Sequence, residues 1–146
     1  MLKPLLDIII VEDNPADIET TLDALYENRL INKVEVLKDG EVAIDYIFGQ
    51  RIHRRFDIFE GPTLILLSLR LPKIDGIEIL RRIRSDGLRK NIPVIVLTSS
   101  RSDQDRLQSF RLGVNGYFVK PIKFERFVNS VVQVGYHWAS RKSRPR

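Results

Sequence analysis

Apolar stretches and helical periodicities alternate along the whole chain. Stretches of strand length and mainly apolar character lie at residues 6–11, 33–37, 63–68, 93–98 and 116–119. Apolar residues at helical spacing mark five further segments, at residues 15–28, 40–48, 76–85, 102–112 and from after Pro121 to Trp138. This alternation predicts an α/β fold: a doubly wound, five-stranded parallel sheet with helices on both faces.

Composition narrows the classes of function. The 146 residues suit one domain with an ordinary hydrophobic core. The absence of cysteine excludes disulfides and thiolate metal sites, and two histidines make a poor zinc site, so any metal must be held by oxygen. No apolar stretch has the length needed to cross a bilayer, and we expect a cytoplasmic protein.

The positive charge is concentrated at the C-terminus. The net charge is +5, and four cations without an acid fall in residues 139–146. We predict a domain over residues 1–138 and a solvated basic tail over 139–146, rather than a basic face for nucleic acid; a tail alone would bind nucleic acid weakly. The irregular stretch at residues 49–61, with His53, Arg54 and Arg55, is interpreted as a solvated surface loop.

Polar residues follow the apolar strands at the ends where the chain leaves the sheet. They are Glu12 and Asp13, Ser68, Thr98 and Lys120. Each residue alone is unremarkable at a strand end, but the carboxyl ends of parallel strands share one edge, where ligands bind. Two carboxylates, hydroxyls and an ammonium together predict a site for a divalent cation and a phosphoryl group.

The motifs around these residues carry a family resemblance. The sequences IIIVEDN, LILLSLRLPKIDG, PVIVLTSS and NGYFVKP, in this order, resemble the receiver domains of bacterial response regulators. The resemblance implies the flavodoxin-like fold of the chemotaxis response regulator, with strand order 2-1-3-4-5. The segments RSDGLRKNIPVIVLTSS and DRLQSFRLGVNGYFVKPIKFERF, with Trp138 near the end, are similar to single-domain regulators of cyanobacterial phytochromes.

The resemblance also implies how a metal ion is held. Glu12 and Asp13 match the acidic pair that binds Mg²⁺, and Arg70 matches the position whose backbone carbonyl completes the protein ligands.

It further implies a switch. Thr98 matches the hydroxyl that follows the phosphoryl group, and Tyr117 matches the aromatic residue that moves with it. Lys120 matches the cation that neutralises phosphoryl charge, and Lys120–Pro121 matches a peptide bond that is usually cis.

The chain departs from the family at the phosphate acceptor, where Ser68 stands in place of aspartate. Asp75 lies too far along, beyond Pro72, to replace it. An ionised carboxylate, with an ordinary pKa of about 3.9, attacks phosphorus without a base, whereas a serine hydroxyl needs one. We therefore predict that aspartyl phosphorylation is lost and that the Mg²⁺ site is weakened.

Three explanations for Ser68 are open: a natural receiver that no longer uses phosphate, an engineered inactive variant, and a serine phosphorylated by an external kinase. An enzyme with Ser68 as a hydrolytic nucleophile is disfavoured, since no G-x-S-x-G motif surrounds the residue and no histidine falls near this edge.

The resemblance implies a sensor histidine kinase, here a phytochrome, as partner. It also implies a homodimer through the helix at 102–112, the strand at 116–119 and the last helix. Tyr136 and Trp138 are the better candidates for that interface, and Phe124 and Phe127 are expected in the core.

Overall fold

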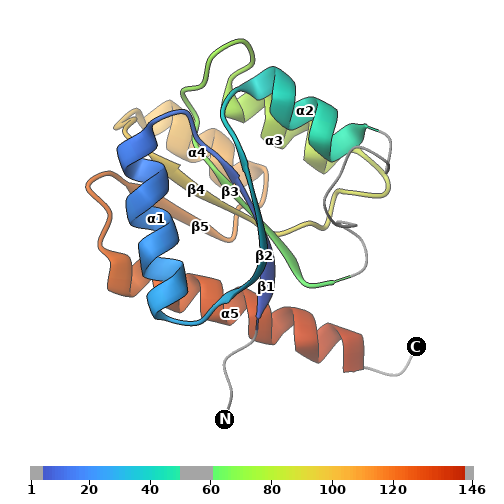
Figure 1. Ribbon diagram of the computed structural model, residues 1–146. Helices are drawn as coiled ribbons and strands as arrows, with labels where there is room; N and C mark the ends of the chain where they lie inside the picture. The colour runs from blue at the N-terminus through green and yellow to red at the C-terminus, as the bar shows by residue number, and fades with distance from the viewer. Residues whose placement is uncertain (1–4, 50–60, 144–146) are drawn as a thin grey trace.

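The computed structural model describes residues 5–49 and 61–143, with side chains as far as Trp138, so the predicted loop charges His53, Arg54 and Arg55 lie outside the described residues. Five parallel strands form one sheet in the order β2-β1-β3-β4-β5. They are β1 (Leu6–Val11), β2 (Ile31–Leu37), β3 (Thr63–Leu67), β4 (Val94–Thr98) and β5 (Gly116–Val119). The helices are α1 (Pro15–Glu27), α2 (Gly40–Phe48), α3 (Gly76–Ser85), α4 (Asp103–Arg111) and α5 (Phe124–Ser143). The predicted fold class and strand order are confirmed (Figure 1).

Helices cover both faces of the sheet, because side chains of a buried strand alternate between two cores. Ile8 and Ile10 of β1 pack in one core with side chains of α1 and α5. Ile9 and Val11 pack in the other core with side chains of α2 and α3. All six residues of β1 are buried. This two-sided burial explains why residues 8–11 of the strand are an unbroken apolar run.

Two elements differ from the sequence-based bounds by two or more residues, and β3, β4, α1 and α4 differ by a single residue at one or both ends. Strand β2 begins at Ile31, two residues earlier than expected, because Ile31 pairs with Leu6 at the start of β1. Helix α5 continues to Ser143, five residues beyond the expected end at Trp138. Alanine, arginine and lysine in positions 139–143 favour helix, and the first proline that could stop it is Pro145. The first part of the predicted tail is therefore helical.

Capping residues fix where helices α1 and α4 begin. The Asn14 side chain accepts a hydrogen bond from the Asp17 backbone N–H at 3.1 Å, and Pro15 follows it. Ser102 is the N-cap of α4, and its hydroxyl accepts from the Asp105 backbone N–H at 3.3 Å. Gly113 follows α4 with a φ of 69°, a left-handed conformation that glycine adopts without steric cost.

Gly76 lets the start of α3 pack directly on the end of β3. A Cβ at this position would lie 2.1 Å from the carbonyl oxygen of Ser68 and 2.8 Å from Cα of Leu69. We expect Gly76→Ala to lower the free energy of unfolding by about 2 kcal/mol or more, since backbone atoms must move to make room. Gly87→Ala is the control, because nothing lies within 4 Å of its Cβ position. Equal urea midpoints for the two variants would contradict this packing.

Candidate functional site at the carboxyl ends of the strands

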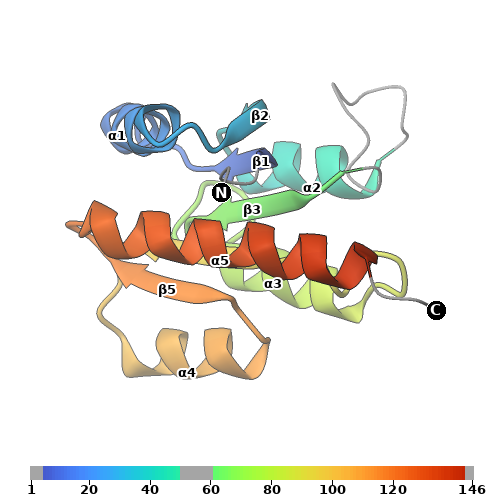
Figure 2. The same cartoon turned by 90° about the horizontal axis from the view of Figure 1, so that it is seen from below.

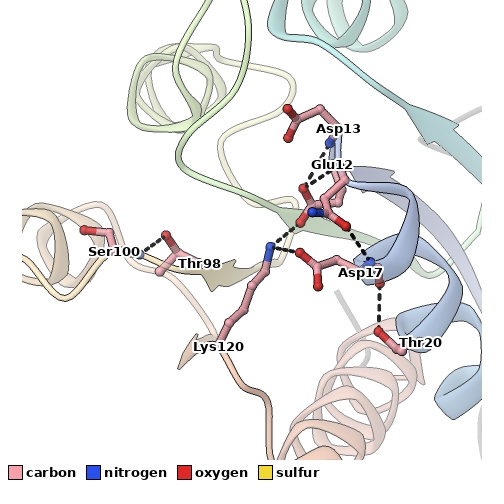
Figure 3. A network of polar contacts seen from close by, with 8 residues as sticks. Glu12, Asp13, Asp17, Thr20, Thr98, Ser100 and Lys120 are labelled. Carbon is pink, nitrogen blue, oxygen red and sulfur yellow. Dashed lines mark hydrogen bonds and ion pairs between the residues drawn. The ribbon is translucent and has the colours of Figure 1, made fainter.

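The carboxyl edge of the sheet brings together residues that are far apart in the sequence. Glu12 follows β1, Ser68 follows β3, Thr98 ends β4 and Lys120 follows β5. The ammonium nitrogen of Lys120 lies 2.6 Å from Oε1 of Glu12, 108 residues away in the chain. Figure 3 shows Lys120 reaching from the end of β5 toward the start of α1. The predicted convergence of the acidic residue and the lysine is thus observed.

Both carboxylate oxygens of Glu12 are engaged by the protein itself. Its side chain is buried, and Oε2 accepts hydrogen bonds from the backbone N–H groups of Asp13 at 3.0 Å and Asn14 at 3.1 Å. Oε1 accepts from Lys120. Asp13 is exposed, and its carboxylate points away from Lys120 (Figure 3). The two acidic residues that look equivalent in the sequence therefore have different environments.

Asp17 is a member of this site that sequence reasoning missed. Its Oδ2 atom accepts a hydrogen bond from the Lys120 ammonium at 2.7 Å, so the ammonium bridges two carboxylates. Burial of Lys120 disfavours its charge, but the hydrogen bonds and negative charges of Asp17 and Glu12 outweigh burial and raise its pKa above the ordinary value. A signal was present, because an acidic residue in the first turn of α1 lies beside the strand end that carries Glu12.

Ser68 is buried just beyond β3, with 6% of its surface exposed. Its backbone N–H donates to the carbonyl of Val11 at 3.0 Å, which fixes it beside the end of β1. Among the described residues, no carboxylate or imidazole hydrogen-bonds to its hydroxyl. His137 lines a hollow of about 500 Å³ with Pro93 and Asn115, at the amino ends of β4 and β5. In the part of the chain that the structure describes, no general base is therefore hydrogen-bonded to the Ser68 hydroxyl.

Thr98 and Tyr117, the two positions predicted to act as a switch, lie on the neighbouring strands β4 and β5. Thr98 is fully buried, and its hydroxyl oxygen accepts from the Ser100 backbone N–H at 3.0 Å. The ring of Tyr117 lies 6.0 Å from that of Phe110 on α4, centroid to centroid. Burial, and then the negative charge of Asp105, raise the pKa of the Tyr117 hydroxyl. The hydroxyl is therefore neutral at physiological pH.

Arg70 connects the loop after β3 to α4 through its side chain, a contact that the sequence did not reveal. Its guanidinium donates to Oδ2 of Asp105 at 2.6 Å, and the Ser100 hydroxyl donates to the same oxygen at 2.6 Å. Asp105 is buried in the first turn of α4. The role expected of the Arg70 carbonyl as a metal ligand stays a prediction. The peptide bond between Lys120 and Pro121 is cis, as predicted.

The carboxylates do not form a ready-made metal site. Nowhere in residues 5–49 and 61–138 are three His, Cys, Asp or Glu side chains placed to hold one ion. Asp13 is available for a hard cation, but Glu12 is fully engaged by Lys120 and backbone N–H groups. A divalent cation would have to displace one of these partners to bind both acidic residues.

Comparison with known proteins agrees with this geometry. The family model described as "Response regulator receiver domain" matches residues 8–132. The chain belongs to the response regulator receiver family. Within the described ranges of this receiver, no helix has the length and apolar character that a membrane crossing requires.

The receiver is similar to several regulators over nearly its whole length. It is 36% identical over 143 residues to the probable methanogenesis regulatory protein FilR2 of Methanothrix harundinacea, covering 94% of this chain and 86% of the relative. It is 32% identical over 138 residues to the response regulator Rcp1 of Synechocystis, covering 94% and 92%.

Solved structures give the same result. The bacteriophytochrome response regulator RtBRR superposes with a TM-score of 0.75 at 41% identity, covering 92% of this chain and 79% of that one. A solved form of Rcp1 contains Mn²⁺; it superposes with a TM-score of 0.72 at 31% identity, covering 90% and 93%. The chain is thus a receiver domain that is similar to the response regulators of phytochromes.

Proposed function

We propose that this chain is a signalling module of a two-component system that works through protein contacts and without aspartyl phosphorylation. The observation that carries the proposal is the buried Ser68 at the acceptor position, beside an otherwise assembled edge with Glu12, Thr98 and Lys120. A serine needs a base to attack phosphorus, and the lysine ammonium is positively charged and cannot act as one. The receiver therefore gains no acyl phosphate that could switch it.

Burial also disfavours phosphorylation of Ser68 by an external kinase. Only 6% of its surface is exposed, and its backbone is fixed by the hydrogen bond to Val11 and by the contact with Gly76. A kinase must surround the hydroxyl of its substrate, which this position does not permit without local unfolding. A phosphorylation-independent receiver accounts better for the site.

The proposed upstream partner is a sensor histidine kinase of the phytochrome type. The support is the similarity to RtBRR and Rcp1, whose matches span most of this chain. In the same proposal the Mg²⁺ site of the family is weakened here, because Ser68 supplies no carboxylate and Glu12 is engaged by Lys120. Asp13 is left as the accessible acidic ligand.

The proposed downstream contact is a second copy of the chain, bound through α4, β5 and α5. Strand β5 is at the edge of the sheet, and α4 and α5 flank it (Figure 2). Leu107 and Phe110 of α4 are both about half exposed, at 51% and 52%, and large apolar side chains in this position are typical of interfaces. Tyr136 of α5 is also exposed, whereas Phe127 belongs to the core.

Trp138, one of the two aromatic residues expected at the interface, lies against the body of the domain. It is half-buried and lines the hollow of about 500 Å³ together with Val134, Asn91 and Pro93. Trp138 would therefore contribute to a dimer indirectly, by shaping the surface around this hollow. Phe110 is the better single position at which to test the interface.

We expect a homodimer without any phosphodonor, measured by sedimentation at tens of micromolar. Phe110→Glu should shift the chain to a monomer, because a charge would be buried against an apolar partner surface. Leu88→Glu is the control, since Leu88 is the most exposed large apolar residue described, at 77%, and lies between α3 and β4. A version of the chain that ends at Val134 should also form a weaker dimer.

The outcomes are separable. A monomeric unmodified chain would refute the dimer. A dimer that survives Phe110→Glu and dissociates with Leu88→Glu would place the interface on another face, and a dimer in the version ending at Val134 would exclude the extension of α5.

A further inference from the structure

We infer that the ammonium group of Lys120 is the resident counter-ion of this site and competes with divalent cations for Glu12. The inference deepens the proposed function and rests on it, because it explains how a receiver without an acceptor carboxylate keeps its acidic edge stable. It also makes Asp17 a positioning residue, since Asp17 holds the ammonium in place.

The contacts of Lys120 carry the first step. Its nitrogen lies 2.6 Å from Oε1 of Glu12 and 2.7 Å from Oδ2 of Asp17. The side chain of Lys120 is only 19% exposed and that of Glu12 only 7%. Water screens such a pair much less than it screens a surface ion pair, so the attraction is strong. An ion that needs Glu12 Oε1 must therefore remove a well-held ammonium.

The other oxygen of Glu12 gives no alternative. Oε2 accepts the backbone N–H groups of Asp13 and Asn14, which turn the carboxylate inward at the start of α1. A cation that took this oxygen would leave the two N–H groups without their acceptor, which makes its binding less favourable. Glu12 is thus satisfied on both sides without a metal ion.

The neutral side chain at position 68 completes the argument. Ser68 brings no negative charge from β3, so the two anions that contact Lys120 come from β1 and α1. Two carboxylates sharing one ammonium leave a single excess negative charge, and the remaining acid, Asp13, is exposed to solvent. Of the two excess negative charges at the site, one lies on the exposed Asp13, and a divalent cation can reach the other only by replacing a contact of Lys120 with Glu12 or Asp17.

Removing the Lys120 ammonium should raise the affinity of the site for divalent cations above that of the unmodified chain. We expect Lys120→Met to bind Mn²⁺ at least about tenfold more tightly than the unmodified chain in calorimetric titrations, because the competing charge is gone. We expect the unfolding temperature of Lys120→Met to rise on adding Mg²⁺, and that of the unmodified chain to be the same in Mg²⁺ and in EDTA.

Three variants serve as comparisons. Lys123→Met is the matched control, since Lys123 is exposed three residues further on, outside the ion-pair network, and it should behave like the unmodified chain. Lys120→Arg keeps the charge and should not gain affinity. Asp17→Asn should lower the unfolding temperature but should not increase the affinity for Mn²⁺, because the Lys120 ammonium still contacts Glu12.

Each result decides the inference. If Lys120→Met binds Mn²⁺ no more tightly than the unmodified chain, or if Lys123→Met gains as much, the inference is wrong. Should Lys120→Met not fold in either buffer, Lys120→Gln gives the same test, because a neutral amide can still donate to Glu12. An unchanged Mn²⁺ affinity in that variant would overturn the inference as well.

The test is independent of the proposed function. A chain that takes no phosphoryl group, and whose Lys120 variants gain no metal affinity, keeps the proposed function and loses this inference. A chain that forms an acyl phosphate loses the proposed function whatever the titrations give.

Discussion

Substituting Ser68 with aspartate should produce a chain that takes a phosphoryl group from acetyl phosphate in the presence of Mg²⁺, whereas the unmodified chain should take none. The new carboxylate would be ionised and would stand beside Glu12, Thr98 and Lys120, on the edge that already holds the other expected groups. An ionised carboxylate attacks phosphorus without a base, so one substitution supplies the missing nucleophile. Intact mass measurement detects one added phosphoryl group.

The controls separate the nucleophile from the shape of the site. Ser68→Asn has nearly the same shape as the aspartate variant and no charge, and it should stay unmodified. The adduct of Ser68→Asp should be labile to hydroxylamine, as an acyl phosphate is. A labile adduct on the unmodified chain would show that another residue, such as Asp75, accepts phosphate. Failure of Ser68→Asp would mean that more than the acceptor has been lost.

Replacing Arg84 with methionine should lower the free energy of unfolding by about 3 kcal/mol, since a guanidinium that joins four carbonyl groups would be lost. Arg84 lies in the last turn of α3. It donates to the carbonyls of Leu112 at 2.7 Å and Gly113 at 3.1 Å, just after α4, and to those of Ile92 at 2.7 Å and Lys90 at 3.2 Å, before β4. These contacts hold the end of α4 against the start of β4.

Arg82→Met provides the comparison on the same helix. Arg82 is about half exposed, and its ion pair with Glu78 at 3.0 Å follows the ordinary i,i+4 spacing. An exposed pair of this kind is worth roughly 0.5 kcal/mol or less. Urea denaturation followed by circular dichroism gives both values. Equal losses for Arg82→Met and Arg84→Met would show that the contacts of Arg84 with the four carbonyl groups add no stability.

The fold could be predicted from the sequence because each element carries its own signal. The apolar run of β1 and the caps at Asn14 and Ser102 are local features, and parallel order then places Glu12 and Lys120 at one edge. The pattern of the family motifs supplied the strand order. The sequence therefore located the edge and the residues at the strand ends, but not Asp17 of α1, which also reaches the edge.

The detailed contacts could not be predicted, because they depend on how side chains turn once the backbone is in place. Nothing in the sequence says whether the Lys120 side chain turns toward Asp17 or toward position 68. Nor does the sequence show that the Arg70 side chain, in the loop after β3, reaches Asp105 on α4. The environment of Trp138 depends on the angle at which α5 crosses the sheet. Such choices are decided by packing and charge over distances that local patterns do not encode.

The length of α5 gives the molecule a rigid arm. Its 20 residues extend roughly 30 Å, whereas the six residues of β1 extend roughly 20 Å. The helix is therefore longer than the strands that it covers. Positions 141 and 142, which carry Arg and Lys, belong to this arm. The backbone at these positions is therefore continuous with the helix that packs on the sheet, and it keeps the direction of that helix beyond the edge of the core.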